Sequence, residues 1–145
     1  MLSFKGWCRA AIAVGAVALA TAPGLSQKGG QLTALSKLER GLWQLRDLDD
    51  GGARHPAICV ADPAMLMQLQ HRNSPCSRLV ISSDPEGVTV HYTCPASGFG
   101  RTSLKVETPR LAQIDTQGIS GSVPFAYRVE ARRIGPCPRR ADAGR

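Results

Sequence analysis

The stretch from Cys76 to Cys94 constrains the fold more than any other, because it has the sequence of a β-hairpin with a cysteine at each open end. Two runs rich in β-branched residues flank an Asp-Pro-Glu-Gly turn at residues 84–87. Pro85 presets the second position of a type I turn, and Gly87 can take the positive φ that closes the hairpin with a bulge. The arms have similar lengths, so the two cysteines are predicted to meet.

Apolar and polar residues alternate with period two over much of the second half of the chain. One face of the run at 101–108 is apolar and the other is charged, and the run at 123–132 alternates most clearly. Strands are expected at residues 42–48, 54–60, 76–83, 88–94, 101–108, 111–116 and 123–132, with connecting loops at 95–100 and 118–124. Strands with one wet face favour an antiparallel sheet.

Two short helices complete the predicted fold. Leucines at helical spacing predict one over residues 32–40, and Asp62 followed by Pro63 has the order of an N-cap and a first helical residue, which predicts a second helix to about His71. The chain is therefore expected to be mainly β: a curved antiparallel meander sheet, an open half-barrel, with one short helix packed at an edge or end and two disulfides.

The N-terminal 20 residues have the order of a cleaved export signal. Lys5 and Arg9 give a positive start, and the apolar run at 10–20 is too short for a bilayer, which takes about 20 apolar residues. Small residues ending at Ala20 match the A-x-A pattern of signal peptidase sites. Cys8 precedes the apolar run, so it is not a lipid-attachment cysteine. We expect export to the periplasm or the medium; an uncleaved anchor is the alternative that the short run disfavours.

Four cysteines remain after cleavage, and an even number in an exported chain predicts two disulfides. The hairpin favours Cys76–Cys94, which leaves Cys59 to pair with Cys137. The alternative joins Cys59 to Cys76 and Cys94 to Cys137. Zinc and redox sites are disfavoured because no Cys-x(2–4)-Cys spacing is present.

The domain organisation follows from these segments and from the charge. Residues 1–20 are the signal peptide, 21–40 a linker with the short N-terminal helix, 41–137 a single β-rich domain, and 138–145 a disordered basic tail. Removing residues 1–20 takes away two of 18 basic residues and none of 11 acidic ones, so the mature chain carries a net charge of +5. A basic balance favours anionic neighbours, although an ordinary solvated surface is the simpler explanation.

Basic side chains of two strands fall on the face opposite the apolar residues, where strand pairing would bring them together. These residues are Arg101, Lys105, Arg128 and Arg132. Glu107 and Glu130 share that face and would neutralise part of its field. The expected partner is an anionic envelope component, either a membrane surface or a cell-wall polymer, bound weakly and in a salt-sensitive way. Nucleic acid is disfavoured, because aromatic residues are not interleaved with the basic ones.

Four segments together resemble the bacterial "domain of unknown function 3617" family. They are Gly-Leu-Trp-Gln-Leu at 41–45, Cys-Val-Ala-Asp-Pro at 59–63, the pair Cys76 and Cys94, and Arg-Arg-Ile-Gly-Pro-Cys at 132–137. The chain departs from the family in lacking acidic residues just after the helix start and methionine-rich stretches. The resemblance implies an envelope or secreted location and a small β-rich fold, and it implies no activity.

No catalytic constellation, cofactor site or metal site is predicted. The three histidines, His55, His71 and His91, have no helical ligand partner, and no Gly-x-Ser-x-Gly elbow is present. The aspartates near residues 47–50 suggest a calcium loop but lack its later glutamate, and turn formation explains them.

Two hypotheses remain. The first is a non-catalytic envelope binding or interaction module. The second is a small hydrolase whose residues converge only in three dimensions. A deep pocket around His91 with a carboxylate would favour the enzyme, and a shallow groove or open cup would favour binding.

Overall fold

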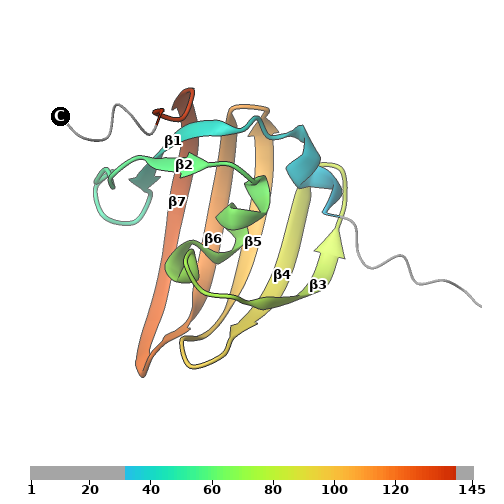
Figure 1. Cartoon of the computed structure of the whole chain (residues 1–145), viewed down its shortest axis with the longest axis vertical. Helices are drawn as coiled ribbons and strands as arrows, with labels where there is room; N and C mark the ends of the chain where they lie inside the picture. Colours follow the sequence, from blue (N-terminus) through green and yellow to red (C-terminus); the bar gives the residue numbers. More distant parts are fainter. Residues whose placement is uncertain (1–31, 140–145) are drawn as a thin grey trace, which may run out of the picture.

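The computed structural model describes residues 32–139, which form one strongly curved antiparallel sheet around two short 3₁₀ helices (Figure 1). The elements in chain order are η1 (Thr33–Lys37), β1 (Gly41–Asp47), β2 (Ile58–Val60), η2 (Pro63–His71), β3 (Ser77–Ser83), β4 (Gly87–Cys94), β5 (Gly98–Thr108), β6 (Leu111–Ser120) and β7 (Val123–Gly135). The strand order is β2-β1-β7-β6-β5-β4-β3, with β2 and β3 at the two edges. The predicted mainly β, open half-barrel meander is confirmed.

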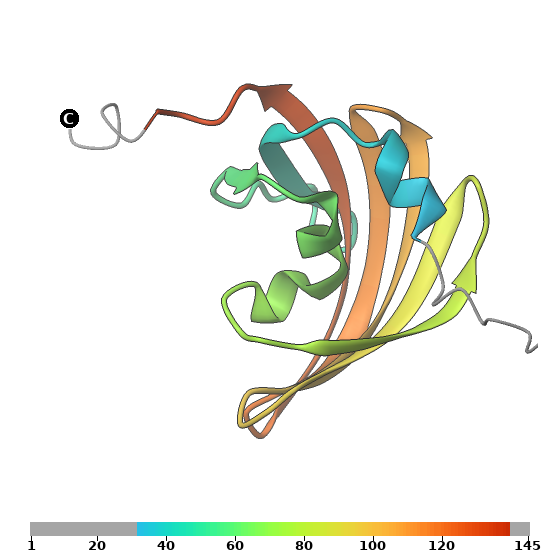
Figure 2. The same cartoon turned by 45° about the vertical axis from the view of Figure 1, so that its right-hand side comes forward.

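The core fills the concave face of the sheet. Alternate residues of β1, β4, β5, β6 and β7 point into it, and η2 lies inside the curve rather than at an edge or end as the sequence suggested (Figure 2). Leu66 and Met67 of η2 are fully buried because they face the strands directly. Asp62 caps η2 as predicted, with its carboxylate accepting a hydrogen bond from the Ala64 N–H.

The segment before β1 joins the same core. The predicted helix at 32–40 is only a 3₁₀ turn, Thr33–Lys37, yet Leu35 and Leu38 are buried. The indole N–H of Trp43 donates to the backbone oxygen of Glu39 at 3.1 Å, which fixes the chain entering β1. The core therefore begins before residue 41.

The β3–β4 hairpin forms at the predicted place, but its turn differs. Gly87 does not have a positive φ. Asp84 closes the turn instead, because its carboxylate accepts hydrogen bonds from the N–H groups of both Glu86 and Gly87 at 2.8 Å. The bulge lies at Ile81 within β3, where the register with β4 shifts.

Three other boundaries were wrong. The strand expected at 54–60 is reduced to Ile58–Val60, with Arg54 making only an isolated bridge, because Pro56 cannot donate to the ladder. The loop expected at 118–124 is mostly strand, since β6 continues to Ser120. The connection expected at 95–100 is also shorter, because β5 already begins at Gly98.

Two glycines lie opposite each other near the end of β5 and β6 that adjoins the β4–β5 turn. Gly100 and Gly118 are cross-strand partners. A Cβ on Gly100 would lie 2.6 Å from the Tyr92 hydroxyl, and one on Gly118 would lie 3.0 Å from the ring of Phe125. The rings of Tyr92 and Phe125 therefore pack directly on the backbone of these glycines, on the concave face of the sheet.

Both predicted disulfides are present, which excludes the alternative pairing. Cys59–Cys137 has a Cα separation of 5.3 Å, and Cys76–Cys94 has one of 4.2 Å. Such bonds persist in oxidising compartments, as expected of an exported protein. No helix within residues 32–139 is long and apolar enough to cross a bilayer. The expected signal peptide and most of the expected basic tail lie outside the described residues.

Candidate functional site

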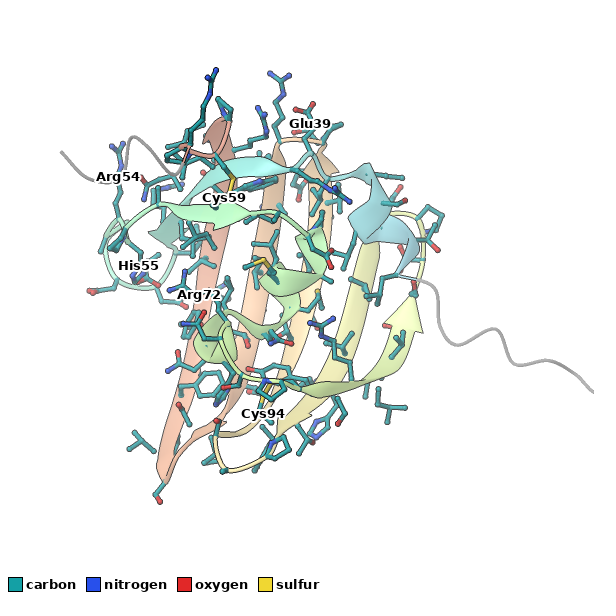
Figure 3. All side chains as sticks on the ribbon, viewed as in Figure 1. Glu39, Arg54, His55, Cys59, Arg72 and Cys94 are labelled. Carbon is teal, nitrogen blue, oxygen red and sulfur yellow. A yellow bond between two sulfur atoms is a disulfide. The ribbon has the colours of Figure 1, made fainter. Side chains whose placement is uncertain are left out.

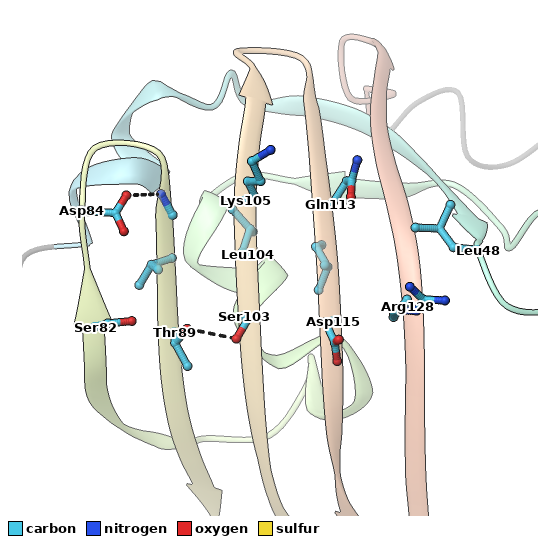
Figure 4. Close-up of a pocket in the computed structure, with 13 residues that line it drawn as sticks. Leu48, Ser82, Asp84, Thr89, Ser103, Leu104, Lys105, Gln113, Asp115 and Arg128 are labelled. Atoms are coloured by element: carbon cyan, nitrogen blue, oxygen red, sulfur yellow. Dashed lines mark hydrogen bonds between the residues drawn. The ribbon is translucent and has the colours of Figure 1, made fainter.

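The strand register places the four predicted basic residues on the outer, convex face of the sheet. A groove of about 360 Å³ crosses this face (Figure 4). Lys105 of β5 and Arg128 of β7 line this groove, together with Asp84 and Asp115. Two carboxylates thus stand among the two cations. The groove is therefore lined by acidic as well as basic side chains.

Ion pairs neutralise most of this face. Lys105 contacts Glu107 at 2.9 Å, and Arg132 contacts Glu130 at 3.5 Å. Arg128 donates from Nε to the Asp49 carboxylate at 3.0 Å; this hydrogen bond lowers the pKa of Asp49 and raises that of Arg128. Exposed pairs of this kind contribute little to stability, but they cancel the field that an anionic partner would feel. Arg101 alone of the four has no ion pair within residues 32–139.

The histidines occupy three different environments. His91 lies on the outer face, with its ring 6.0 Å from that of Phe99, and no carboxylate pairs with it in the described part of the chain. His71 is buried: its Nε2 donates to the Ser97 carbonyl at 3.0 Å, and its Nδ1 lies 3.2 Å from the Tyr92 hydroxyl. It ties η2 to the β4–β5 hairpin. The predicted enzyme signature, His91 with a carboxylate partner, is therefore not found among residues 32–139.

The third histidine borders a cavity on the inner side of the sheet. This cavity, of about 340 Å³, lies between β1 and β7, the loop leading to β2, and the end of η2. Its walls are mostly apolar, formed by Leu45, Ile58, Leu69, Val129 and neighbouring residues. Its polar side chains are Tyr127, His55, Arg72 and Gln70. An apolar pocket with a few converging polar groups is the usual form of a small-molecule site.

Tyr127 is the least exposed of these polar side chains. Burial raises the pKa of its phenol to about 12, with a smaller contribution from nearby Tyr92. Its hydroxyl has no hydrogen-bond partner among residues 32–139. The hydroxyl is therefore a proton donor that a ligand can use.

Two basic groups stand at the mouth of the cavity, on the same side of the molecule (Figure 3). Arg72 follows η2, is exposed, and forms no ion pair in the described range. His55 follows the β1 turn, and its Nε2 lies 2.8 Å from the Asp47 carboxylate. Arg72 is thus the cation left available to an anionic group.

This arrangement can bind, but it lacks the parts for covalent hydrolysis. The Asp47–His55 pair has the orientation of a base held by an acid. No serine, threonine or cysteine lines the cavity among the described residues. No cluster of three or more metal-ligating side chains occurs within residues 32–139 either.

No family model, curated protein or solved structure matches the chain. The function is therefore argued from this geometry. Sequence reasoning missed the cavity, because it forms only once η2 folds into the curve. The one local signal for this site was the turn at 49–52. It reverses the chain, so that Asp47 before the turn and His55 after it come close together.

Proposed function

We propose that this protein is an exported, non-catalytic binding module of the cell envelope that holds a small amphipathic anion in the inner cavity. The observation that carries the proposal is the combination of apolar walls with the unpaired guanidinium of Arg72 and the free hydroxyl of Tyr127. The apolar part of a ligand would lie against Leu45, Leu69 and Val129. Its anionic group would face Arg72.

The size and charge of the cavity define the ligand class. A volume of about 340 Å³ is at the lower end of the range for small-molecule pockets, so the ligand is small. Asp47 is the nearby carboxylate, and its contact with His55 occupies it. A short acyl carboxylate has the required chemistry, with an apolar chain and one negative charge.

A small hydrolase is the second candidate, and the Asp47–His55 pair is the observation in its favour. That mechanism would need a water molecule as nucleophile, because the lining residues supply no hydroxyl or thiol other than the phenol of Tyr127. Burial raises the pKa of that phenol, which opposes its use as a nucleophile. Binding without turnover is the better account.

Location in the envelope is supported by the two disulfides, by the signal-like N-terminus and by the resemblance of four segments to the domain of unknown function 3617 family. The ion pairs of Lys105, Arg128 and Arg132 on the outer face argue against these three residues as the binding site for an anionic ligand. We therefore place the anion site in the cavity.

Calorimetric titration with octanoate and with octanol tests the proposal. Octanoate is expected to bind more tightly, because octanol fills the apolar walls without pairing with Arg72. Arg72→Gln is expected to weaken octanoate binding about tenfold while leaving octanol binding unchanged. Arg54→Gln is the matched control, since Arg54 is an exposed arginine of the neighbouring loop that does not line the cavity. Equal weakening by both variants, or no octanoate binding, would reject the cavity as the anion site.

A further inference from the structure

Strand register divides the outer face of the sheet into two unlike halves. At the end near the β4–β5 and β6–β7 turns, one row of paired residues is Ser77, Thr93, Phe99, Ile119 and Pro124, and the next is Leu79, His91, Arg101, Gln117 and Ala126. Neither row contains a carboxylate. The following rows hold Asp115, Glu130 and their basic partners. The turn end of this face thus mixes apolar and neutral polar side chains, with no acidic group and with Arg101 as its one permanent charge.

The two turns at this end form one projecting unit. The N–H of Gly121 in the β6–β7 turn donates to the carbonyl of Ser97 in the β4–β5 turn at 2.8 Å. Figure 2 shows the two hairpin tips side by side at the lower end of the sheet, beyond η2. Apolar side chains project from both sides of these tips: Phe99, in the outer row, is 44 % exposed, and Val123, which pairs with Ser120 in the inner row, is 67 % exposed. Large apolar groups on a fixed tip can enter an apolar phase without a cost for ordering the backbone.

A hollow behind the same tips has a mostly polar lining without acidic groups. This hollow, of about 560 Å³, lies between both turns and the end of η2, lined by Ser74, Ser97, Ser120, Asn73, Arg72 and their neighbours. Hydroxyl and amide donors with an unpaired arginine suit phosphate oxygens. Apolar tips beside phosphate-binding groups match the two layers of a membrane interface, where acyl chains lie beneath headgroups.

We propose that this end of the sheet docks on the surface of an anionic lipid bilayer, with Val123 and Phe99 entering the interface and Arg101 contacting lipid phosphates. Charge decides for a membrane over a second copy of the chain: in a two-fold dimer through this patch each Arg101 would face a surface with no carboxylate to pair with it. An anionic bilayer supplies that negative charge together with the apolar layer. This proposal goes beyond ligand binding in the inner cavity and does not depend on it.

Co-sedimentation of the processed chain, lacking residues 1–20, with vesicles tests the docking. Vesicles of phosphatidylglycerol and phosphatidylcholine in equal parts are compared with vesicles of phosphatidylcholine alone. The wild-type chain is expected to bind the anionic vesicles more strongly. Val123→Asp is expected to lose about tenfold or more in partitioning on both kinds. Arg101→Gln is expected to lose about fivefold on the anionic vesicles only.

Matched variants separate this end from the rest of the molecule. Ile134→Asp adds the same charge at the opposite end of β7, where the side chain is 54 % exposed, and is expected to bind as the wild type does. Arg132→Gln removes one charge from the ion-paired half of the outer face and is expected to have little effect. Thermal melting checks that each variant is folded, and Phe99→Ser replaces Val123→Asp if the latter is not.

Three results would overturn the proposal. The first is no binding of the wild-type chain to either kind of vesicle. The second is an equal loss in Val123→Asp and Ile134→Asp. The third is a lipid-free dimer that Val123→Asp dissociates, which would assign this end to self-association. Arg72 lines both the inner cavity and the hollow, so Arg101→Gln separates the two sites: it is expected to weaken binding to the anionic vesicles and to leave octanoate binding unchanged.

Discussion

Tyr127 allows the burial of the inner cavity to be measured directly. The chain has two tyrosines, Tyr92 and Tyr127, and burial raises the pKa of both, that of Tyr127 to about 12. An ordinary tyrosine ionises near pH 10. Tyrosinate absorbance of the folded protein is therefore expected to develop at higher pH than in the unfolded chain, with that of Tyr127 appearing only near pH 12.

The same shift sets the stability of the protein in alkali. The pKa of Tyr127 is higher in the folded state than in the unfolded state, so its contribution is fully present below pH 10 and is lost as the pH rises toward 12. Two pH units correspond to about 2.7 kcal/mol of unfolding free energy at most. Tyr127→Phe keeps the ring and removes the ionisable group. It is expected to remove the part of the alkaline loss that is due to Tyr127, about 1.4 kcal/mol at pH 11. It is expected to change stability little at pH 7, because the hydroxyl has no hydrogen-bond partner among residues 32–139.

Urea unfolding at pH 8, 10 and 11 for the wild type and Tyr127→Phe measures the effect, and Tyr92 supplies the residual slope in the variant. One tyrosine titrating near pH 10 in the folded protein would contradict the burial of both. Parallel stability curves for wild type and variant would show that Tyr127 is already solvated and that the cavity is more open than the structure shows.

Two further predictions concern the frame that holds the cavity. Replacing both Cys59 and Cys137 by alanine is expected to lower the unfolding free energy by about 4 kcal/mol, because the bond spans 78 residues of chain; an unchanged urea midpoint would refute this. Gly118→Ala is expected to cost about 3 kcal/mol or more, since its Cβ would press on the backbone carbonyl of Phe99. Gly135→Ala is its control, because a Cβ there meets nothing within 4 Å. A similar loss of unfolding free energy in both variants would argue against the close backbone approach of β5 and β6 at Gly118.

Local sequence patterns predicted the antiparallel sheet and the two disulfides, although not every strand boundary. The similar arms around the 84–87 turn placed Cys76 beside Cys94, and period-two alternation gave the inward and outward faces of β5 and β7. The identity of the turn-closing residue was not apparent, because Asp84 and Gly87 each suit a tight turn and only the backbone geometry distinguishes them.

The candidate site could not be predicted in the same way, because it depends on how η2 packs. The period of residues 63–71 indicates a helix with an apolar side, but not that the helix folds into the curve and leaves a space beside Tyr127. The ion pair between Asp49 and Arg128 could not be predicted from the sequence either. Asp49 lies 79 residues before Arg128, and no local pattern links a turn in the first half of the chain to the outer face of the last strand.

The position of a bound probe tests the central claim most directly. Backbone amide shifts of the chain from residue 21 onward, recorded by NMR during titration with octanoate, distinguish the inner cavity from the groove on the outer face. The account predicts shifts that cluster at Leu45, Ile58, Leu69 and Val129 and that Arg72→Gln diminishes. Shifts that cluster instead around Lys105 and Arg128 on the outer face would contradict it.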